Sequence, residues 1–396
     1  GTLLMMCFTL SLTGFTASMA STLDRSLEDA VNYRVGADQV IVTVTDAQAE
    51  QSAPTEDGQQ PTLSVIGYNA PPVEDLLAVP GVYQVSRVGR YPARLSIPGQ
   101  RLDGVVLGVD RATMAAVTRF RHDYANDSLA DLFNRLAGQR NGVLISTRTA
   151  VDYNLLIGQE ITLQINALNE WYETRVPILG VLNYFPTLNP NEGFFAITNI
   201  DPLFELAGTV LPHNVWLSLE ADADPQAVRD AVRASGFPVL EWQDPQTALQ
   251  IAQASPSRRG VLGFLSVGFI ASITLTIISA IIQSTASFRA QVTQLGSLRA
   301  MGLGGLSVAG YLITLQGMIA GSGILSGTSI GLATTLLFLP LLDFSGGLPP
   351  YLVRVAWNDI ALVYGVFAGV LLVVTLFITI ILGRQSLITV VKLGDA

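Results

Sequence analysis

The chain has 396 residues, a net charge of −9 and only one cysteine and two histidines. One cysteine excludes an internal disulfide and a thiolate metal cluster. Three acids and five bases follow Gly260, so the other 28 acids and 17 bases, a net charge of −11, precede it. A chain of this length holds roughly two domains, and the charge division predicts a boundary near Gly260.

Four stretches without a charged residue predict membrane spans: residues 1–23, 260–288, 300–342 and 360–383. A helix needs about 20 mainly apolar residues to cross a bilayer. We expect an α-helical membrane domain at 260–396 and four transmembrane helices in all, at 1–23, about 260–286, 306–328 and 360–383. The third stretch exceeds one span but is short for two, and we expect one.

The first stretch is interpreted as a span and not as a secretory signal. No basic residue precedes Leu3, and no clear cleavage site follows. Since the chain begins with Gly1 rather than Met, we expect it to be a piece of a longer protein. Cys7 lies within the apolar stretch and is expected to be a packing residue.

Between the first two spans, residues 24–259 predict a mixed α+β domain on the aqueous side of a membrane. Leu23, Leu27 and Val31 are spaced as on a helix that continues out of the first span. Residues 46–62, rich in Ala, Gln, Pro and Glu, predict a flexible loop. A last helix is expected from Asp244 to about Arg259.

β-branched and aromatic runs predict the strands of this domain, and short apolar-periodic segments predict its helices. The expected strands are 40–44, 82–87, 93–97, 104–109, 142–146, 160–165, 174–182, 194–198 and 215–219. The expected helices are 73–78, 112–117, 129–136 and 225–234.

The basic residues near the spans predict the orientation. Arg289 and Arg299 lie between the second and third spans without an acid, and Arg384 and Lys392 follow the last span. Short loops rich in Lys and Arg stay in the cytoplasm. The segment 287–305 is therefore expected in the cytoplasm, and the acidic domain on the other side of the cell membrane.

Glycines recur at helical spacing in the membrane domain. Small residues four apart let helices approach closely in lipid. Two interpretations stay open, packing within the chain and a dimer seam. The glycines are Gly317 and Gly321, the run Gly323, Gly327 and Gly331, and the pair Gly365 and Gly369.

Residues for chemistry are scarce. His122 and His213 lack a metal-binding spacing, no G-x-S-x-G motif is present, and the single lysine, Lys392, excludes a Walker A loop. No charged residue lies inside the expected spans, which argues against an ion-coupled pump. We therefore expect no enzyme, no cofactor and no metal site, and energy for any work would come from a partner.

The segment 288–303 resembles the signature of the FtsX-like permease family of ABC transporters, which includes MacB-type exporters and lipoprotein-releasing permeases. Leu298-Arg299-Ala300-Met301-Gly302 is similar to the family's Leu-Arg-Ala-Leu-Gly. Residues 33–38, 142–146, 156–163 and 180–187 resemble segments of its external domain, and 391–394 resembles its ending. The order of one span, a large domain and three spans agrees as well.

The resemblance implies that 287–305 docks on an ATPase as a coupling loop. Arg289 and Arg299 would lie on a polar side of a short helix, with Val292, Leu295 and Leu298 on its apolar side, and Gly302 in the closing motif. A merely membrane-flanking loop is the alternative. Gln291 and Gln316 stand where the family commonly has Glu, and Gly304-Gly305 replaces a polar turn, which weakens coupling through charge.

The implied function is that of a permease subunit that moves a lipid, lipoprotein or amphipathic substrate. Its partners would be an ABC ATPase subunit, a second copy or sister permease half, and the lipid bilayer, with no nucleic acid. Two alternatives stay open. One is a mechanotransmitter that regulates cell-wall hydrolases through an extracytoplasmic partner protein, and the other is a structural subunit without transport.

Overall fold

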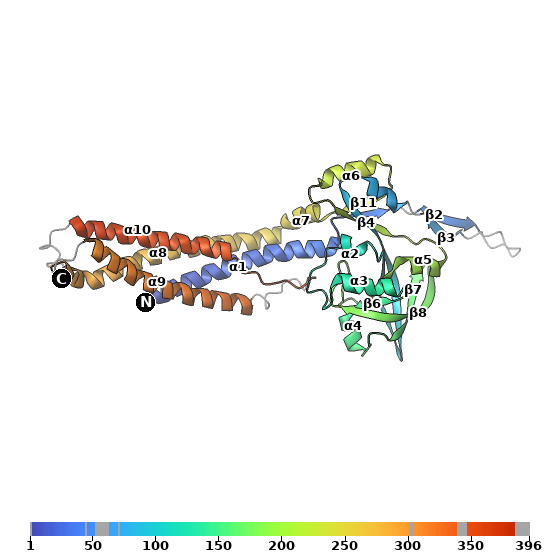
Figure 1. Cartoon of the computed structure of the whole chain (residues 1–396), viewed down its shortest axis with the longest axis horizontal. Coiled ribbons are helices and arrows are strands. Elements are labelled where there is room, and N and C mark those ends of the chain that lie inside the picture. The colour runs from blue at the N-terminus through green and yellow to red at the C-terminus, as the bar shows by residue number, and fades with distance from the viewer. Residues whose placement is uncertain are drawn as a thin grey trace. The chain divides into compact units, whose positions relative to one another are not determined.

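The computed structural model describes residues 2–43, 46–51, 63–69, 72–300, 305–338 and 347–384 (Figure 1). The chain forms two compact units. The helical unit comprises Gly1–Leu27 and Gln253–Ala396, and the α+β unit comprises Glu28–Ala252. Helix α1 (Thr2–Val35) contributes residues to both units. The α+β unit thus follows α1 in sequence and precedes the remaining helices, as an insertion does.

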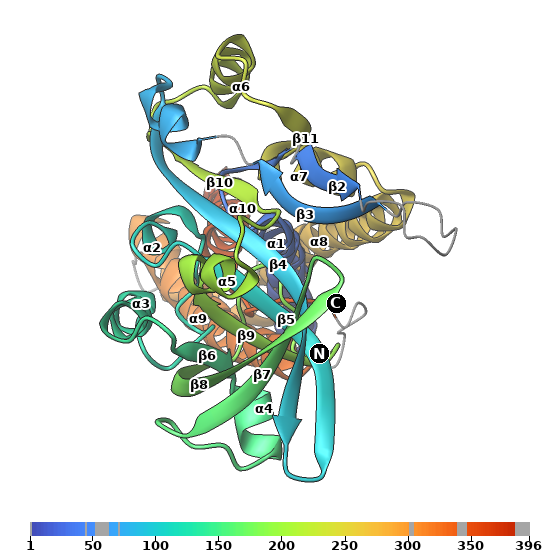
Figure 2. The same cartoon turned by 90° about the vertical axis from the view of Figure 1, so that its right-hand side faces the viewer.

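A sheet of nine strands builds the α+β unit, in the order β11-β1-β10-β4-β5-β9-β6-β8-β7 (Figure 2). Most neighbours are antiparallel, whereas β5 with β9 and β6 with β8 are parallel. The strands are β1 (Gln39–Thr43), β4 (Val82–Ile97), β5 (Gln100–Val109), β6 (Val143–Ser146), β7 (Glu160–Ala167), β8 (Glu170–Leu182), β9 (Phe194–Asn199), β10 (Asn214–Leu219) and β11 (Val239–Gln243).

Six of these strands close into a ring. The last strand of the order, β7, also pairs with β4, where Ala93 lies opposite Ile165 and Ser96 opposite Thr162. A closed ring leaves no free strand edge among its members. Alternate residues of all six strands form one apolar core, which includes Leu95, Val106 and Ile178. The β4–β7 pairing therefore makes this part of the sheet a small barrel with its own core.

Helices cover the remaining sheet surfaces and complete two more cores. They are the 3₁₀ helix η1 (Val73–Ala78), α2 (Met114–Val117), α3 (Leu129–Gly138), α4 (Thr147–Asp152), α5 (Ile200–Ala207), α6 (Pro225–Ala234) and α7 (Pro245–Gln253). One core joins the end of α1 to α2, α3 and the sheet. The other lies where α6 and η1 pack on β1, β4 and β10. Ser128 caps α3 and Asp224 caps α6, each by accepting a backbone N–H.

Several elements differ from the sequence-based expectation. The expected strands 82–87 and 93–97 are one continuous strand, β4. Part of the expected flexible loop 46–62 is ordered into β2 (Asp46–Gln51), which pairs with β3 (Leu63–Asn69); residues 52–62 lie outside the described residues. Helices α4 and α5 and strand β11 were not expected. The pairing partner of β2 lies 12 residues or more along the chain, so local composition did not reveal the hairpin.

The helical unit contains the first part of α1 together with α8 (Pro256–Ala300), α9 (Gly305–Phe338) and α10 (Trp357–Arg384). In the described residues, two segments are long and apolar enough to cross a membrane, Gly317–Leu337 and Trp357–Val374, and Gly263–Ser279 is a shorter apolar segment. The sequence analysis expected four spans, and the spans at 1–23 and 260–286 stay predictions.

Two boundaries in this unit differ from the expected ones. The segment 287–300, where a short helix separate from the second span was expected, is a direct continuation of α8. The third expected span, at 306–328, falls within a longer helix that ends at Phe338, and its apolar window lies at Gly317–Leu337. No helix-breaking proline interrupts either stretch, so the helices continue past the points where the charge pattern changes.

Candidate functional site

The residues expected to contact an ATPase lie at the end of α8. Arg289, Val292, Leu295, Leu298 and Arg299 all fall on the helical backbone of Pro256–Ala300. Their side chains and Gly302 lie outside the described part of the structure. Their helical spacing places the three apolar residues at intervals of three, so they share roughly one side of the helix.

Two of the expected packing glycines face α1. A Cβ on Gly327 would lie 2.9 Å from the Cβ of Leu10, and one on Gly331 would lie 2.8 Å from the backbone oxygen of Ser11. Gly323 is also buried. Larger side chains would push the two helices apart, so Gly327 and Gly331 belong to a contact within the chain.

The other expected packing glycines face open space. A Cβ on Gly317 or Gly321 of α9 would meet no atom within 4 Å, and the same holds for Gly365 and Gly369 of α10. These four positions therefore tolerate a side chain in the single chain. In the sequence these glycines could not be told apart. In the structure, Gly327 and Gly331 pack against α1, whereas Gly317, Gly321, Gly365 and Gly369 have open space beside them.

Polar side chains connect α1 to α9 and to the segment that precedes α10. The sulfur of Cys7 lies 2.8 Å from Oγ of Ser326 on α9. The hydroxyl of Thr22 accepts a hydrogen bond from the N–H of Arg354 (3.0 Å) and donates one to its carbonyl oxygen (3.2 Å). Such bonds stabilise helix association where water is excluded. Local spacing gave no signal for these pairs, which lie more than 300 residues apart in sequence.

The last two turns of α1 belong to the core of the α+β unit. Val31, Tyr33 and Val35 are buried. The Tyr33 hydroxyl donates to the carbonyl oxygen of Leu188, and the Tyr33 carbonyl oxygen accepts the N–H of Thr187 at 2.8 Å. Burial raises the pKa of Tyr33 well above its usual range. The end of α1 is therefore held by packing and by two hydrogen bonds.

Two ion-paired arginines also hold the end of α1. Arg121 donates to Asp29 on α1 at 2.7 Å and to Asp123 at 2.6 Å, and all three side chains are largely buried. Arg119 donates to Asn32 of α1 at 2.9 Å and pairs with Asp38 at 2.7 Å. Removing one partner of a mostly buried ion pair leaves an uncompensated charge. These pairs therefore resist separation of α1 from the sheet.

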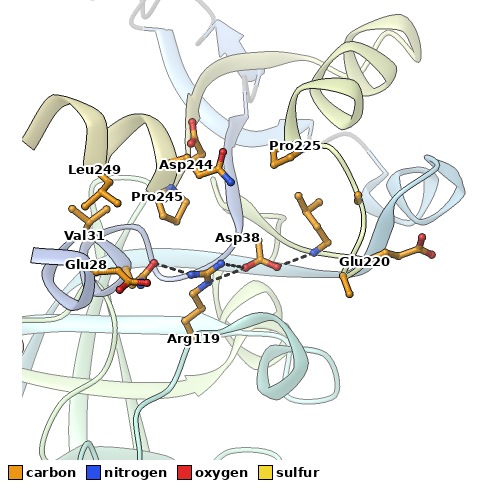
Figure 3. Close-up of a pocket in the computed structure, with 14 residues that line it drawn as sticks. Glu28, Val31, Asp38, Arg119, Glu220, Pro225, Asp244, Pro245 and Leu249 are labelled. Carbon is orange, nitrogen blue, oxygen red and sulfur yellow. Dashed lines mark hydrogen bonds and ion pairs between the residues drawn. The ribbon is translucent and has the colours of Figure 1, made fainter. Parts of the chain in front are cut away.

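A pocket of about 430 Å³ lies between the end of α1 and the start of α7, inside the α+β unit (Figure 3). Val31, Leu249 and Pro245 provide an apolar part of its wall. Four of its lining residues are acidic and one is basic: Glu28, Asp38, Glu220, Asp244 and Arg119. Pockets of roughly 300–1,000 Å³ are typical of small-molecule sites.

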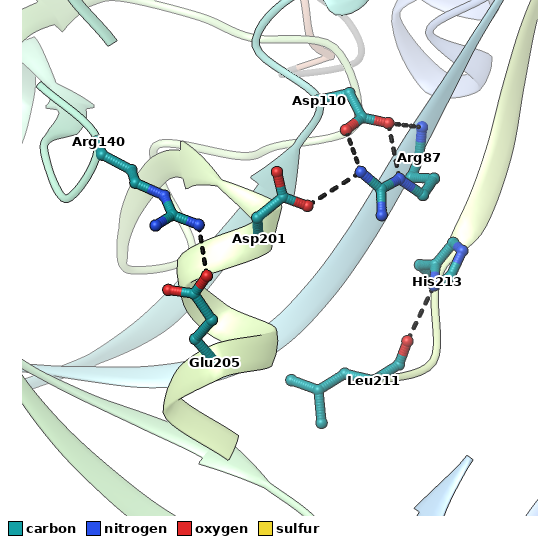
Figure 4. A network of polar contacts seen from close by, with 7 residues as sticks. All are labelled: Arg87, Asp110, Arg140, Asp201, Glu205, Leu211 and His213. Carbon is teal, nitrogen blue, oxygen red and sulfur yellow. Dashed lines mark hydrogen bonds and ion pairs between the residues drawn. The ribbon is translucent and has the colours of Figure 1, made fainter. Parts of the chain in front are cut away.

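A second polar cluster joins β4, β5 and α5 (Figure 4). The guanidinium of Arg87 donates two hydrogen bonds to Asp110, at 2.9 and 2.6 Å, and one to Asp201 at 3.0 Å, and the backbone N–H of Arg87 donates a third to Asp110 at 3.0 Å. The bonds to Asp110 raise the pKa of Arg87, which keeps it charged. His213 is buried nearby, with Nδ1 2.9 Å from the carbonyl oxygen of Leu211.

The polar cluster around Arg87 has a structural role, which is to hold β4, the end of β5 and α5 together. Every charge in it has a partner, and burial lowers the pKa of His213 so that the ring stays neutral. Among the described residues, no group of three or more His, Cys, Asp or Glu side chains could hold a metal ion. The arrangement ties strand ends to a helix and provides no nucleophile beside a base.

Comparison with known proteins gives only remote similarities. No family model and no curated protein matches the chain. Among solved structures, the extracellular domain of the noncanonic ABC-type transporter YknZ from Gram-positive bacteria shares 16% identity at a TM-score of 0.31, over 43% of this chain and 85% of that one.

Two further solved structures show similarly remote likeness to the chain. The periplasmic region of MacB from Actinobacillus actinomycetemcomitans shares 8% identity at a TM-score of 0.34, over 56% of this chain and 95% of that one. A domain of a putative permease protein from Porphyromonas gingivalis shares 15% identity at a TM-score of 0.31, over 53% and 88%.

Proposed function

We propose that this chain is a membrane-bound permease subunit of an ABC transporter complex. Hydrolysis of ATP by a separate partner subunit would move the helices and, through them, the α+β unit, in order to export or extract a lipid, lipoprotein or amphipathic substrate. The observation that carries the proposal is the insertion of an α+β unit between α1 and the helices α8–α10, together with the Leu298–Gly302 motif at the end of α8.

The exposed surface of the helical unit supports a place in the bilayer. Large apolar side chains point away from the other helices, with exposed fractions of 80% for Phe264, 72% for Leu325 and 63% for Phe377. A soluble protein rarely exposes a contiguous apolar surface of this kind. Lipid tails would cover it without a hydration cost, which agrees with a cell-membrane location.

The length of α8 supports a coupling role for its end. A helix of 45 residues is roughly 68 Å long, about twice the hydrocarbon thickness of a bilayer. The uncharged residues 260–288 are enough to cross, so the part from Arg289 to Ala300 would extend beyond the lipid as a rigid continuation. A partner that moved this end would also move the membrane part of the same helix.

Helices lie at both connections of the α+β unit, and Ala254 and Ser255 separate the second helix, α7, from α8. The chain enters the unit through α1, whose end is held by Tyr33, Arg119 and Arg121, and it leaves through α7. Asp244 caps α7 by accepting the N–H of Thr247 at 2.7 Å and is also paired with Arg229 of α6. Helices that are anchored in this way transmit displacement better than a flexible linker does.

The test is purification of the chain from native membranes, followed by identification of the proteins that accompany it. We expect an ABC ATPase whose activity falls when Arg299→Ala or Leu295→Ala is introduced, with Leu325→Ala in the exposed apolar face as the matched control. An ATPase rate that ignores the α8 variants would contradict the proposal. Recovery of a cell-wall hydrolase as the main partner, with no transported compound, would favour the mechanotransmitter instead.

A further inference from the structure

We propose that an apolar patch on the α+β unit docks on the surface of a lipid bilayer. The patch lies on α4 and on the turn that follows it, at the periphery of the unit (Figure 2). Its four side chains come from the short segment 151–157 and are Val151, Tyr153, Leu156 and Ile157. We call this set the α4 patch.

The side chains of the α4 patch face solvent. The exposed fractions are 68% for Val151, 71% for Leu156 and 59% for Ile157. Single apolar residues are common on protein surfaces and need no explanation. Several that gather on one short segment indicate an interaction surface, because each of them keeps apolar area in water until a partner covers it.

The segment that carries the α4 patch is held in place on its inner side. Leu155 is buried in the core of the strand ring. Ser146 caps α4 by accepting the N–H of Thr149 at 3.1 Å. Gly158, with a φ of +90°, follows at the turn, and its N–H donates to the carbonyl oxygen of Ile178 at 2.7 Å. The exposure of the patch is therefore a feature of the packed fold.

The size of the α4 patch argues against a protein as its occupant. A stable protein interface uses roughly 20–30 residues on each side, whereas the α4 patch consists of four apolar side chains. A contact of this size holds two free molecules together poorly. It suffices for a unit that is already tethered beside its partner, because tethering raises the effective concentration of the partner.

A bilayer is the surface beside which this chain would be tethered. The α+β unit begins at Glu28, five residues after the expected end of the first span at residue 23, and α1 is continuous through this point. Five residues of helix are about 8 Å long. The inference rests here on the membrane location in the proposed function, and not on the ATPase.

Hydrogen bonds within the α+β unit connect the end of α1 to α4. The carbonyl oxygen of Tyr33 on α1 accepts the N–H of Thr187 at 2.8 Å, and Arg148 of α4 donates to the side-chain oxygen of Asn191. The four residues of chain from Thr187 to Asn191 reach at most about 14 Å. Helix α4 is therefore close to the end of the helix through which the chain enters the unit.

The composition of the α4 patch fits a surface of neutral lipid. Leu156 and Ile157 are adjacent aliphatic residues at the turn, and Tyr153 has the amphipathic ring that is common at membrane interfaces. Arg148 and Asp152 form an ion pair at 3.6 Å, so their charges cancel. The next acid, Glu160, is exposed and would be repelled by anionic lipid. Docking would thus use the insertion of apolar side chains among the headgroups.

The test uses the full chain in phosphatidylcholine nanodiscs without an ATPase. In a Cys7→Ala background, Leu156→Cys is labelled with an environment-sensitive dye. We expect a blue shift of its emission and quenching by lipids that carry a spin label near the headgroup. Leu240→Cys is the matched control, since Leu240 on β11 has the same exposed fraction of 71%, and its label should show neither effect. Leu325→Cys on α9 reports whether the helices lie in the bilayer.

A pair of variants checks that the apolar side chains cause the docking. With the label at Val151→Cys, the double substitution Leu156→Glu with Ile157→Glu should abolish the quenching, because carboxylates do not enter the apolar part of the bilayer. Leu240→Glu should leave the quenching unchanged. All the substituted side chains are exposed, and circular dichroism would confirm that each variant is folded.

Equal quenching of the labels at Leu156 and Leu240 would overturn the proposal, as would quenching at Val151 that survives the double substitution. A blue shift that grows with protein concentration, without quenching by lipid, would show a contact between copies of the chain and would also overturn it. Quenching at Leu325 but not at Leu156 would remove the docking and leave the membrane location standing. Quenching at neither position would contradict the membrane location itself.

Discussion

The backbone N–H of Thr187 donates a 2.8 Å hydrogen bond to the carbonyl oxygen of Tyr33, which lies two residues before the end of α1 at Val35. The neighbouring Leu188 accepts the Tyr33 hydroxyl through its own carbonyl oxygen. Tyr33 and Thr187 belong to the segments 33–38 and 180–187, two of those in which the sequence resembles the FtsX-like permease family. The two segments are thus parts of one contact that fixes the end of α1.

The Tyr33 hydroxyl is expected to stabilise the α+β unit. Tyr33→Phe removes the bond to Leu188 and leaves a buried carbonyl oxygen without its donor, so we expect a loss of about 1–3 kcal/mol in the free energy of unfolding. Urea denaturation followed by circular dichroism would measure it. Tyr83→Phe, at a position 64% exposed on β4, is the control and should change stability by less than about 0.5 kcal/mol. Equal effects of the two substitutions would contradict the assignment.

Gly36 is expected to be essential for the end of α1. Its φ is +88°, and a Cβ there would lie 2.2 Å from the ring of Trp216. Gly36→Ala should therefore cost more than the roughly 1–2 kcal/mol of a left-handed conformation alone. Gly99→Ala is a matched control, since Gly99 has a φ of +82° but no atom within 4 Å of an added Cβ. Thermal unfolding of both variants would isolate the contribution of the Trp216 contact, and similar midpoints would refute it.

The contact of α1 with α9 can be tested by cross-linking. The 2.8 Å separation of the Cys7 sulfur from Ser326 Oγ predicts that Ser326→Cys forms a disulfide with Cys7 after mild oxidation. Adding Gly331→Leu should lower the yield severalfold, because the new side chain would collide with the backbone of Ser11. Adding Gly321→Leu, where the space is open, should leave the yield unchanged. Mass spectrometry of the digested protein provides the readout, and an unchanged yield with Gly331→Leu would contradict the packing.

His213 is expected to make the α+β unit sensitive to acid. Burial, and then the charge of Arg87, lower its pKa against the opposing effect of the bond to Leu211. The folded state therefore binds the proton less readily than the unfolded chain does. This contribution to stability is fully present above the unfolded pKa of about 6.5 and is lost as the pH falls below it.

The measurement is the unfolding midpoint between pH 7.5 and 5. We expect His213→Gln to flatten the decline in stability seen for the unsubstituted chain over this range, since the amide does not titrate. His122→Gln serves as the comparison and should leave the decline in place. A pH profile that is identical in the His213→Gln variant would show that other groups govern the acid sensitivity.

Sequence patterns were sufficient to predict long apolar helices, a mixed α+β unit between them and most of the local elements. Uncharged stretches such as 360–383 predicted long apolar helices. Each charged residue in a lipid-spanning helix costs free energy, so a long stretch without charges is a signal that can be read from the local sequence alone. Alternating β-branched residues likewise predicted strands close to those observed at 104–109 and 194–198. The boundary of the helical unit near Gly260 was also indicated by the change in charge.

Only the tertiary structure decided which distant residues meet. The ring closure between β4 and β7, the pairing of Arg121 with Asp29, and the division of the glycines into packed and open positions depend on contacts between segments far apart in the chain. Helix and strand periodicity reflects interactions over a few residues, whereas these contacts are fixed by how whole elements pack together. The pocket between α1 and α7 exists for the same reason, since no single segment contains more than a part of its wall.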